Sequence, residues 1–343
     1  MPRKTQMNSI TSPEKTALIN KSNMRLRDDF LSYLSSIQRS EGTIRQYAAD
    51  LLIVYTFILE KLNNKDFQDL TKRDIVSMQN WLINEHGNSP ARVRRIKSTI
   101  SSLSNYIENV LDDEPEFEGF RSIVRKIESP VNQPVREKTV LTTEEVECLL
   151  DILTEKQHYD KACVVALAAY SGRRKSELVR FKVSDFGDDH IVCDGALYKS
   201  APIKTKGRGV NGKQLNCFTL VKKFKPYLDN WMRYREENGI ESEWLFPDKD
   251  DHTQQMSPDT LNSWAITFSR HLDKPVYLHS FRHFYTTELV RAGIPASVIK
   301  QIVGWESIDM VDTYTDIDAD EQIGMYFSDG DISVPEKRGL SDV

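Results

Sequence analysis

The sequence predicts a mainly α-helical fold with a small antiparallel β-sheet (α+β), divided into two domains. The chain has 343 residues, which is long for one domain and ordinary for two. Apolar residues recur at spacings of three and four through most of it, as on one face of a helix. Residues 189–220 instead combine β-branched residues, glycines and short alternation, so we expect the strands there.

Helices fill the first domain, which we place at residues 24–127. Its second helix follows Ser40, and its third opens at Thr71 with Asp74 three residues later, a capping-box pattern. A fourth spans about residues 90–110. The apolar stripes of the first, second and fourth helices are Leu26, Phe30 and Leu34; Ile44, Tyr47, Leu51, Val54 and Phe57; and Val93, Ile96, Ile100, Leu103 and Ile107.

The second domain is placed at residues 140–321, after an extended linker at 128–139 that contains Pro130 and Pro134. Residues 1–23 are polar and lack periodicity, so we expect a flexible N-terminal tail, and residues 322–343 form a C-terminal tail. The helices predicted in the second domain include 221–235, 258–272, 279–292, 295–303 and 307–316, and its three short strands lie near 191–192, 197–205 and 214–220.

Composition restricts the class of protein. The sequence has no apolar run long enough to cross a membrane, and its polar start lacks the apolar core of a signal peptide, so we expect a cytoplasmic or nucleoid-associated protein. The four cysteines form no CxxC pair and have no histidine at zinc-finger spacing, so we expect reduced thiols and no structural metal. A net charge of −5 argues only weakly against a nucleic-acid partner, because acidic runs can mask a basic face.

A turn between two helices carries the first candidate site residues. A buried helix is expected to end at Gly172, and another begins at once. Arg174 then lies at a helix N-terminus, where backbone amides and the helix dipole favour an anion. Glu177, three residues later, shares its helix face. Taken alone, the segment is equally well explained as a basic turn with a surface ion pair.

Three further segments of the second domain carry residues suited to phosphate chemistry. His279 and Arg282 share a helix face and can both reach one phosphate. Tyr314 follows Trp305 by nine residues, and Lys204 lies in a predicted hairpin at 203–208. Each segment alone has an ordinary explanation, as a solvated surface pair, core aromatic residues or a charged turn.

In this order and spacing, the segments resemble the tyrosine recombinase (phage integrase) family, whose simple members have two domains. The resemblance covers the second domain as the catalytic domain, and the helical first domain is similar to the family's core-binding domain. It implies that Arg173 is a decoy beside Arg174 and that Lys206 is an alternative to Lys204. The catalytic site it implies consists of Arg174, Glu177, Lys204, His279, Arg282, Trp305 and the nucleophile Tyr314.

The chemistry of phosphoryl transfer accounts for these residue types. A phosphodiester repels nucleophiles, and attack adds charge to its non-bridging oxygens, which two arginines would neutralise by bidentate contacts. A tyrosine hydroxyl has a pKa of about 10, so it needs a proton acceptor, for which His279 is the candidate. Lys204 would protonate the leaving 5′-hydroxyl, Glu177 would orient the basic residues, and Trp305 would donate its indole N–H. A covalent 3′-phosphotyrosine conserves the bond energy, so we expect no ATP, no metal and no other cofactor.

A basic cluster opens the fourth helix of the first domain and suits phosphate contacts or entry into the major groove of DNA. A solvated basic face is the alternative explanation. Two residues of the second helix are added by the family resemblance, and the two domains would clamp duplex DNA. The candidates for DNA binding are Arg92, Arg94, Arg95 and Lys97, with Arg45 and Gln46 on the second helix.

The resemblance implies a double-stranded DNA recombination site as the partner and no membrane. It also implies a homotetramer on DNA, because exchanging two duplexes needs four strand cuts; the free protein would be a monomer or a dimer. An apolar cluster in the C-terminal tail would dock on a neighbouring chain or fold back on its own: Ile323, Met325, Tyr326 and Phe327.

Other functions remain open at this point. A type IB topoisomerase or a hairpin telomere resolvase would use the same chemistry, and a non-catalytic DNA-binding protein would keep the fold. The chain length, the short N-terminal extension and the complete residue set favour a simple site-specific recombinase that integrates, excises or resolves DNA.

Overall fold

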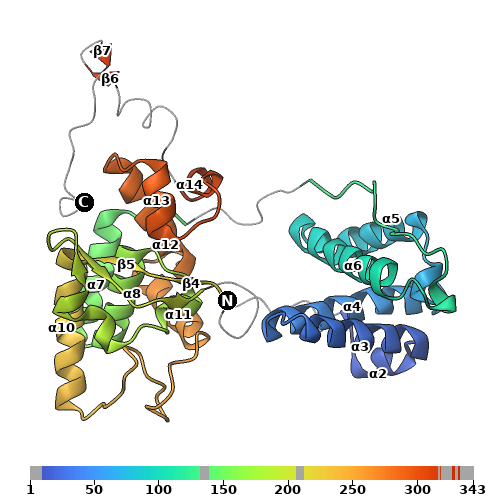
Figure 1. The fold of residues 1–343 in the computed structure, drawn as a ribbon, viewed down its shortest axis with the longest axis horizontal. Coiled ribbons are helices and arrows are strands. Elements are labelled where there is room, and N and C mark those ends of the chain that lie inside the picture. The colour runs from blue at the N-terminus through green and yellow to red at the C-terminus, as the bar shows by residue number, and fades with distance from the viewer. Residues whose placement is uncertain are drawn as a thin grey trace. The chain divides into compact units, whose positions relative to one another are not determined.

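The computed structural model describes residues 10–131, 139–205, 212–315 and 317, and the backbone of two short strands, β6 (Phe327–Ser328) and β7 (Asp331–Ile332), which pair antiparallel. The described chain divides into two compact units, one up to residue 131 and the other from residue 139. Each unit has its own hydrophobic core. The elements are mostly helices with short antiparallel strands, which confirms the predicted fold class (Figure 1).

Within residues 10–131, the first unit is built from helices and the loops between them. Helix α4 lies at its centre, and α2, α3 and α6 pack against it (Figure 1). The predicted capping box at Thr71 and Asp74 is confirmed, as are the first, second and fourth helices. The helices are α2 (Pro13–Leu18), α3 (Lys21–Ser36), α4 (Glu41–Lys61), α5 (Lys72–Asn80), which continues as a π-helical turn (Trp81–Glu85), and α6 (Pro90–Val110).

The prediction of a flexible tail over residues 1–23 is wrong from residue 10 onward. The Ser12 side chain accepts a hydrogen bond from the Lys15 backbone N–H and caps α2, whose first residue is Pro13. Ile10 and Ile19 are buried in the core of the unit. A helix of six residues is too short to show a periodic pattern, which is why the sequence did not reveal it. Residues 1–9 lie outside the described residues.

Helix α8 is the centre of the second unit. Its residues from Ala162 to Ser171 are all buried, and α7, α10 and α12 pack around it. An all-apolar helix surface of this kind is expected for a helix inside a core. The helices of the unit are α7 (Thr143–Glu155), α8 (Tyr159–Ser171), α9 (Lys175–Leu178), α10 (Val221–Glu237), α11 (Thr260–His271), α12 (Leu278–Arg291), α13 (Ala296–Val303) and α14 (Asp309–Tyr314).

Besides the β6–β7 pair, short strands form two separate antiparallel sheets in the described part of this unit. One has the order β1-β2-β5, from β1 (Ile191–Val192), β2 (Leu197–Lys199) and β5 (Phe218–Leu220). The other pairs β3 (Ile203–Lys204) with β4 (Gln214–Leu215). The predictions of single strands at 197–205 and 214–220 are therefore wrong. Pro202 has no N–H for a ladder, and the chain passes there from one sheet to the next.

Two predicted segments cannot be compared with the structure. Most of the linker, residues 132–138, lies outside the described residues. So do Ile323, Met325 and Tyr326 of the C-terminal cluster, and for Phe327 only the backbone is described. Within the ranges given above, none of the helices combines the length and the apolar character that a membrane span requires.

Candidate active site

The turn after α8 is the framework of the site. Gly172 ends the helix with φ of +61°, and a Cβ there would stand 2.5 Å from Cδ1 of Tyr285, so both conformation and space require glycine. The Gly172 carbonyl accepts a hydrogen bond of 2.7 Å from Nη1 of Arg282. This contact connects the turn to α12, which lies 110 residues further along the chain.

Arg174 lies at the N-terminus of α9, as predicted. The Glu177 carboxylate accepts from the Arg174 backbone N–H and from Nη1 of its guanidinium, each at 3.0 Å. Glu177 is 1% exposed, whereas the Arg174 side chain is 31% exposed. The buried Glu177 carboxylate thus holds the guanidinium of the partly exposed Arg174 side chain, and its role in orienting the basic residues for catalysis stays a prediction.

Arg282 is a buried cation beside the predicted nucleophile. Its guanidinium carbon stands 5.1 Å from the ring centre of Trp305 and 5.4 Å from that of Tyr314. Burial lowers the pKa of Arg282, and the charges of Arg174 and Arg173 act in the same direction. Burial and the neighbouring positive charges both disfavour the charged form of this guanidinium. A bound anion would favour the charged form again and so stabilise the cation.

The ring of Tyr314 is surrounded by four side chains, those of His279, Arg282, His283 and Trp305. It stacks on His283 with ring centres 4.6 Å apart, and the rings of His279 and Trp305 each lie at 5.0 Å. The short helix that carries Tyr314 begins at Asp309, whose backbone N–H donates to the Ser307 hydroxyl at 3.2 Å, and its N-cap residue, Ile308, forms no side-chain capping bond. The structure therefore brings His279, Arg282, Trp305 and Tyr314 together in one cluster.

His279 is a neutral base in this surrounding. Desolvation, together with the nearby charges of His283, Arg282 and Arg174, lowers the pKa of His279 to about 4. The imidazole therefore carries a free lone pair near pH 7. A phosphate bound between these cations would raise the pKa of His279 again, because its negative charge favours the imidazolium form.

Two buried donors in this cluster have no acceptor within the described part of the chain: Nε of Arg282 and Nε1 of Trp305. Buried N–H groups are nearly always hydrogen-bonded in native proteins, so unpaired ones require an explanation. Both belong to side chains that contact the Tyr314 ring. Phosphate oxygens beside that ring would supply the acceptors that the protein does not provide.

Lys204 is held near this cluster by the β3–β4 hairpin. A Cβ at Gly304, which has φ of +75°, would stand 2.7 Å from Cδ1 of Leu215, so β4 packs directly on the residue before Trp305. The Lys213 ammonium pairs at 3.2 Å with the carboxylate of Glu306, the residue that follows Trp305. The hairpin that carries Lys204 is thus beside the site, as predicted. The alternative, Lys206, lies outside the described residues.

Arg173 has a structural role. This fits the interpretation that Arg174, and not its neighbour Arg173, is the site residue of the turn. Arg173 is 1% exposed and donates to the carbonyl oxygens of Ser171 and Ile302 and to Sγ of Cys217 at 3.4 Å. These bonds tie the α8 turn to the end of α13. From the sequence, Arg173 was only a decoy beside Arg174, and its burial was not predicted, because arginines are mostly exposed.

We expect Arg173→Ala to lower the free energy of unfolding by about 3 kcal/mol, because two buried carbonyl groups, those of Ser171 and Ile302, lose their donor. Arg174→Ala, which removes a partly exposed side chain, should cost much less stability and far more cleavage activity. Urea unfolding of both variants, with Lys175→Ala as a surface control, measures the difference. Wild-type stability of Arg173→Ala would contradict this assignment.

The residues predicted to bind DNA are only partly available for it. Lys97 is buried and donates to the Ile127 carbonyl and to the Ser129 hydroxyl, so its predicted role is corrected: it holds the chain after α6 in place. Arg94 is exposed and donates to the Pro130 carbonyl at 3.1 Å. Arg45 is exposed, with a long ion pair of 4.0 Å to Glu41.

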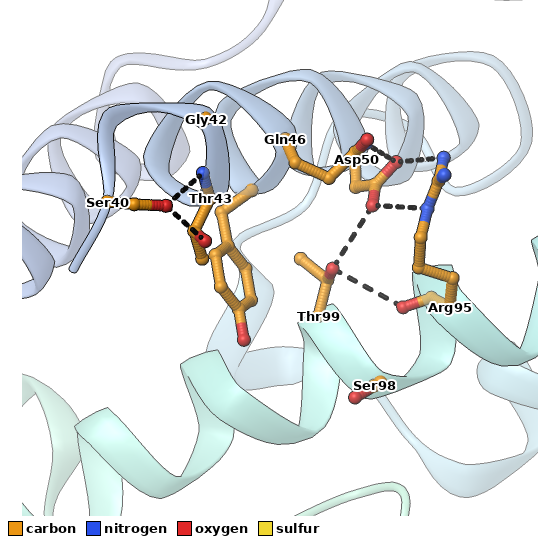
Figure 2. Close-up of a pocket in the computed structure, with 9 residues that line it drawn as sticks. Ser40, Gly42, Thr43, Gln46, Asp50, Arg95, Ser98 and Thr99 are labelled. Carbon is orange, nitrogen blue, oxygen red and sulfur yellow. Dashed lines mark hydrogen bonds and ion pairs between the residues drawn. The ribbon is translucent and has the colours of Figure 1, made fainter. Parts of the chain in front are cut away.

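Gln46 and Arg95 contact Asp50 (Figure 2), a residue that was not predicted from the sequence, and Arg92 pairs with the same carboxylate. His283 was also missed. It follows His279 by four residues on α12 and so lies on the same helix face, and this spacing was the available signal. No group of three or more histidine, cysteine or acidic side chains in the described ranges is arranged to hold a metal ion.

Known proteins share the sequence family and the fold of this chain. The profile of the phage integrase family matches residues 139–321. The SPbeta prophage-derived recombinase-like protein YomM of Bacillus subtilis (strain 168) is 30% identical over 239 residues, which are 69% of this chain and 68% of the relative. The chain therefore belongs to the phage integrase family. Within that family it is a tyrosine recombinase, an enzyme of site-specific DNA recombination.

Solved structures share the two-unit architecture. The XerH site-specific recombinase bound to a palindromic difH substrate is similar with a TM-score of 0.64 and 16% identity, covering 93% of this chain and 91% of that one. A lambda integrase tetramer bound to a Holliday junction gives 0.60 and 17%, covering 89% and 81%. At these identities the likeness concerns the fold.

Proposed function

We propose that this recombinase cuts duplex DNA with Tyr314 as the nucleophile. The observation that carries the proposal is the Tyr314 ring enclosed by His279, Trp305 and a buried Arg282, with two buried N–H donors lacking acceptors. A phosphodiester seated beside the ring satisfies those donors and places its phosphorus near the tyrosine hydroxyl. Arg174 and Arg282 neutralise the non-bridging oxygens as charge develops.

The reaction exchanges one phosphate ester for another. The Tyr314 oxygen forms a bond to phosphorus while its proton passes to the neutral His279, and the bond from phosphorus to the 5′-oxygen breaks. Lys204 gives a proton to the leaving 5′-oxygen. Religation reverses each step with a 5′-hydroxyl from another strand. The number of phosphoester bonds is unchanged, so the step needs neither an oxidant nor ATP.

The first unit, in this proposal, is the DNA-binding domain, with Arg45, Gln46, Arg92, Arg94 and Arg95 as its contacts. Residues 140–321 form the catalytic domain, and four chains assemble on two recombination sites, since each chain supplies one nucleophile for four strand cuts. The C-terminal tail exchanged between neighbours would close the ring. Acting on chromosomal or phage DNA, the protein would work in the cytoplasm of its cell.

Cleavage of DNA carrying a nick beside the cut site tests the proposal, because loss of the short fragment traps the covalent intermediate. We expect an adduct that resists denaturants and forms equally with EDTA present and ATP absent. Duplex without the site is the control and should give none. A cleavage step that stops on chelation, or products without protein attached, would contradict the mechanism.

A further inference from the structure

A single buried carboxylate organises the polar side chains between α4 and α6. Asp50 is 0% exposed and accepts from Nε and Nη2 of Arg95, both at 3.2 Å, and from Nε2 of Gln46 at 3.1 Å. Nη1 of Arg92 lies 3.1 Å from the same carboxylate, and the Thr99 hydroxyl donates to it at 3.4 Å. Figure 2 shows Gln46 and Arg95 converging on Asp50 from the two helices.

Stability does not explain this arrangement. Placing a carboxylate inside a protein costs free energy, and well-packed apolar residues in such positions are commonly as stabilising as a buried ion pair. Burial raises the pKa of Asp50, although Arg95 acts in the opposite direction. Asp50 instead fixes the orientation of the side chains that pair with it. Two arginines and a glutamine, all flexible when unpaired, are held in defined orientations.

Gln46, Asp50 and Arg95 border an open pocket of about 450 Å³, and Arg92 contacts Asp50 without being one of the lining residues. The Arg92 and Arg95 side chains are 21% and 43% exposed, so part of each side chain is accessible. The other lining side chains are mostly small and hydroxylic. The pocket, which we call the α4–α6 pocket, is lined by Ser40, Gly42, Thr43, Gln46, Tyr47, Asp50, Arg95, Ser98 and Thr99 (Figure 2).

Duplex DNA is the partner whose chemistry fits this surface. Arginine and glutamine recognise guanine and adenine edges through paired hydrogen bonds, and such contacts need a fixed side-chain geometry. Hydroxyl groups supply neutral contacts to phosphates. Unpaired arginines, in contrast, attach to any phosphate and add affinity without selectivity.

We propose that Asp50 is a positioning residue for DNA sequence recognition. It holds Gln46 and Arg95 in the α4–α6 pocket, and Arg92 on the same carboxylate, so that these side chains select the recombination site over other DNA. The proposal rests on the proposed function, in that it takes the first unit to bind DNA. In this proposal, Asp50 has two opposite effects on DNA binding. Its charge offsets one of the two arginines, which weakens binding to DNA in general, and its geometry strengthens binding to the correct sequence.

Asp50→Asn tests this, because asparagine keeps the shape and one acceptor oxygen but removes the charge. The probes are a duplex that the wild-type protein selects from a randomised library and a scrambled duplex of equal length. We expect the preference for the selected duplex to fall by about 10–100-fold, while affinity for scrambled DNA stays equal or rises. The slope of log K against log salt should steepen by about one unit.

Glu108→Gln is the matched control. Glu108 lies on α6, the helix that also carries Arg92 and Arg95, and pairs with Arg125 at 2.9 Å. Replacing it with glutamine changes the net charge of the protein by the same amount as Asp50→Asn. Its variant should keep the wild-type preference. Gln46→Ala supplies a second arm that leaves the charge unchanged: we expect lower preference with an unchanged salt slope, and this arm decides the matter if Asp50→Asn fails to fold.

The outcomes separate the two proposals. The inference is wrong if folded Asp50→Asn keeps its preference for the selected duplex, or if it loses affinity for both duplexes by the same factor. Either result would show that Asp50 does not position the side chains that recognise the sequence. If the wild-type protein enriches no sequence and forms no adduct, the proposed function itself has failed, whatever Asp50 does.

Discussion

Tyr314→Phe should bind its recombination site with wild-type affinity and form no covalent adduct with DNA. The substitution removes only the hydroxyl oxygen, so the ring contacts with His283, Trp305 and Arg282 persist and the fold is retained. Without that oxygen no bond to phosphorus can form. A gel shift measures binding, and denaturing electrophoresis of the nicked substrate measures the adduct.

Tyr285→Phe is the matched control for this variant. Tyr285 is also a buried tyrosine of the second unit, and its hydroxyl has no hydrogen-bond partner in the described chain. Its loss should leave both binding and cleavage unchanged. An adduct formed by Tyr314→Phe would place the nucleophile elsewhere and refute the assignment.

Arg282→Lys should lower the single-turnover rate of cleavage by at least about 10²–10³-fold with much less effect on DNA affinity. Lysine keeps the charge but cannot both donate to the Gly172 carbonyl and present a planar pair of donors to a phosphate. The effect should therefore fall on the transition state. Cleavage rate and dissociation constant, measured on the same substrate, separate the two contributions.

Arg291→Lys, on the same helix, is the control for that measurement. Arg291 forms an exposed ion pair with Glu288 at 3.1 Å and lies outside the Tyr314 cluster. Its variant should cleave at the wild-type rate. An Arg282→Lys enzyme that loses affinity and rate by equal factors would show that Arg282 serves binding alone.

Periodicity predicted the helices well because each one buries an apolar stripe. The helix from Pro90 to Val110 and the capped helix after Thr71 follow directly from such patterns. The strands were harder, since two or three residues are too few to alternate. Helix α2 was missed for the same reason, and its stability depends on caps and on contacts with distant residues.

The site residues could be predicted from their order along the chain, but their environment could not. Sequence gave no sign that Arg173 is buried and donates to the Ile302 carbonyl, because this contact spans 129 residues. The burial of Lys97 could not be predicted either, because its ammonium donates to the carbonyl of Ile127, 30 residues later. Nor could that of Asp50, since it depends on how α4 and α6 pack. Residue type and spacing report chemistry, whereas tertiary packing decides which charges remain available.

The most direct test of the central claim is to locate the covalent bond. The adduct trapped on nicked DNA is digested with a protease and a nuclease, and the peptide that carries the nucleotide is sequenced by mass spectrometry. We predict a 3′-phosphotyrosyl linkage on the peptide that contains Tyr314. A linkage on Tyr277, Tyr285, Tyr326 or any residue other than Tyr314 would contradict the mechanism proposed for this site.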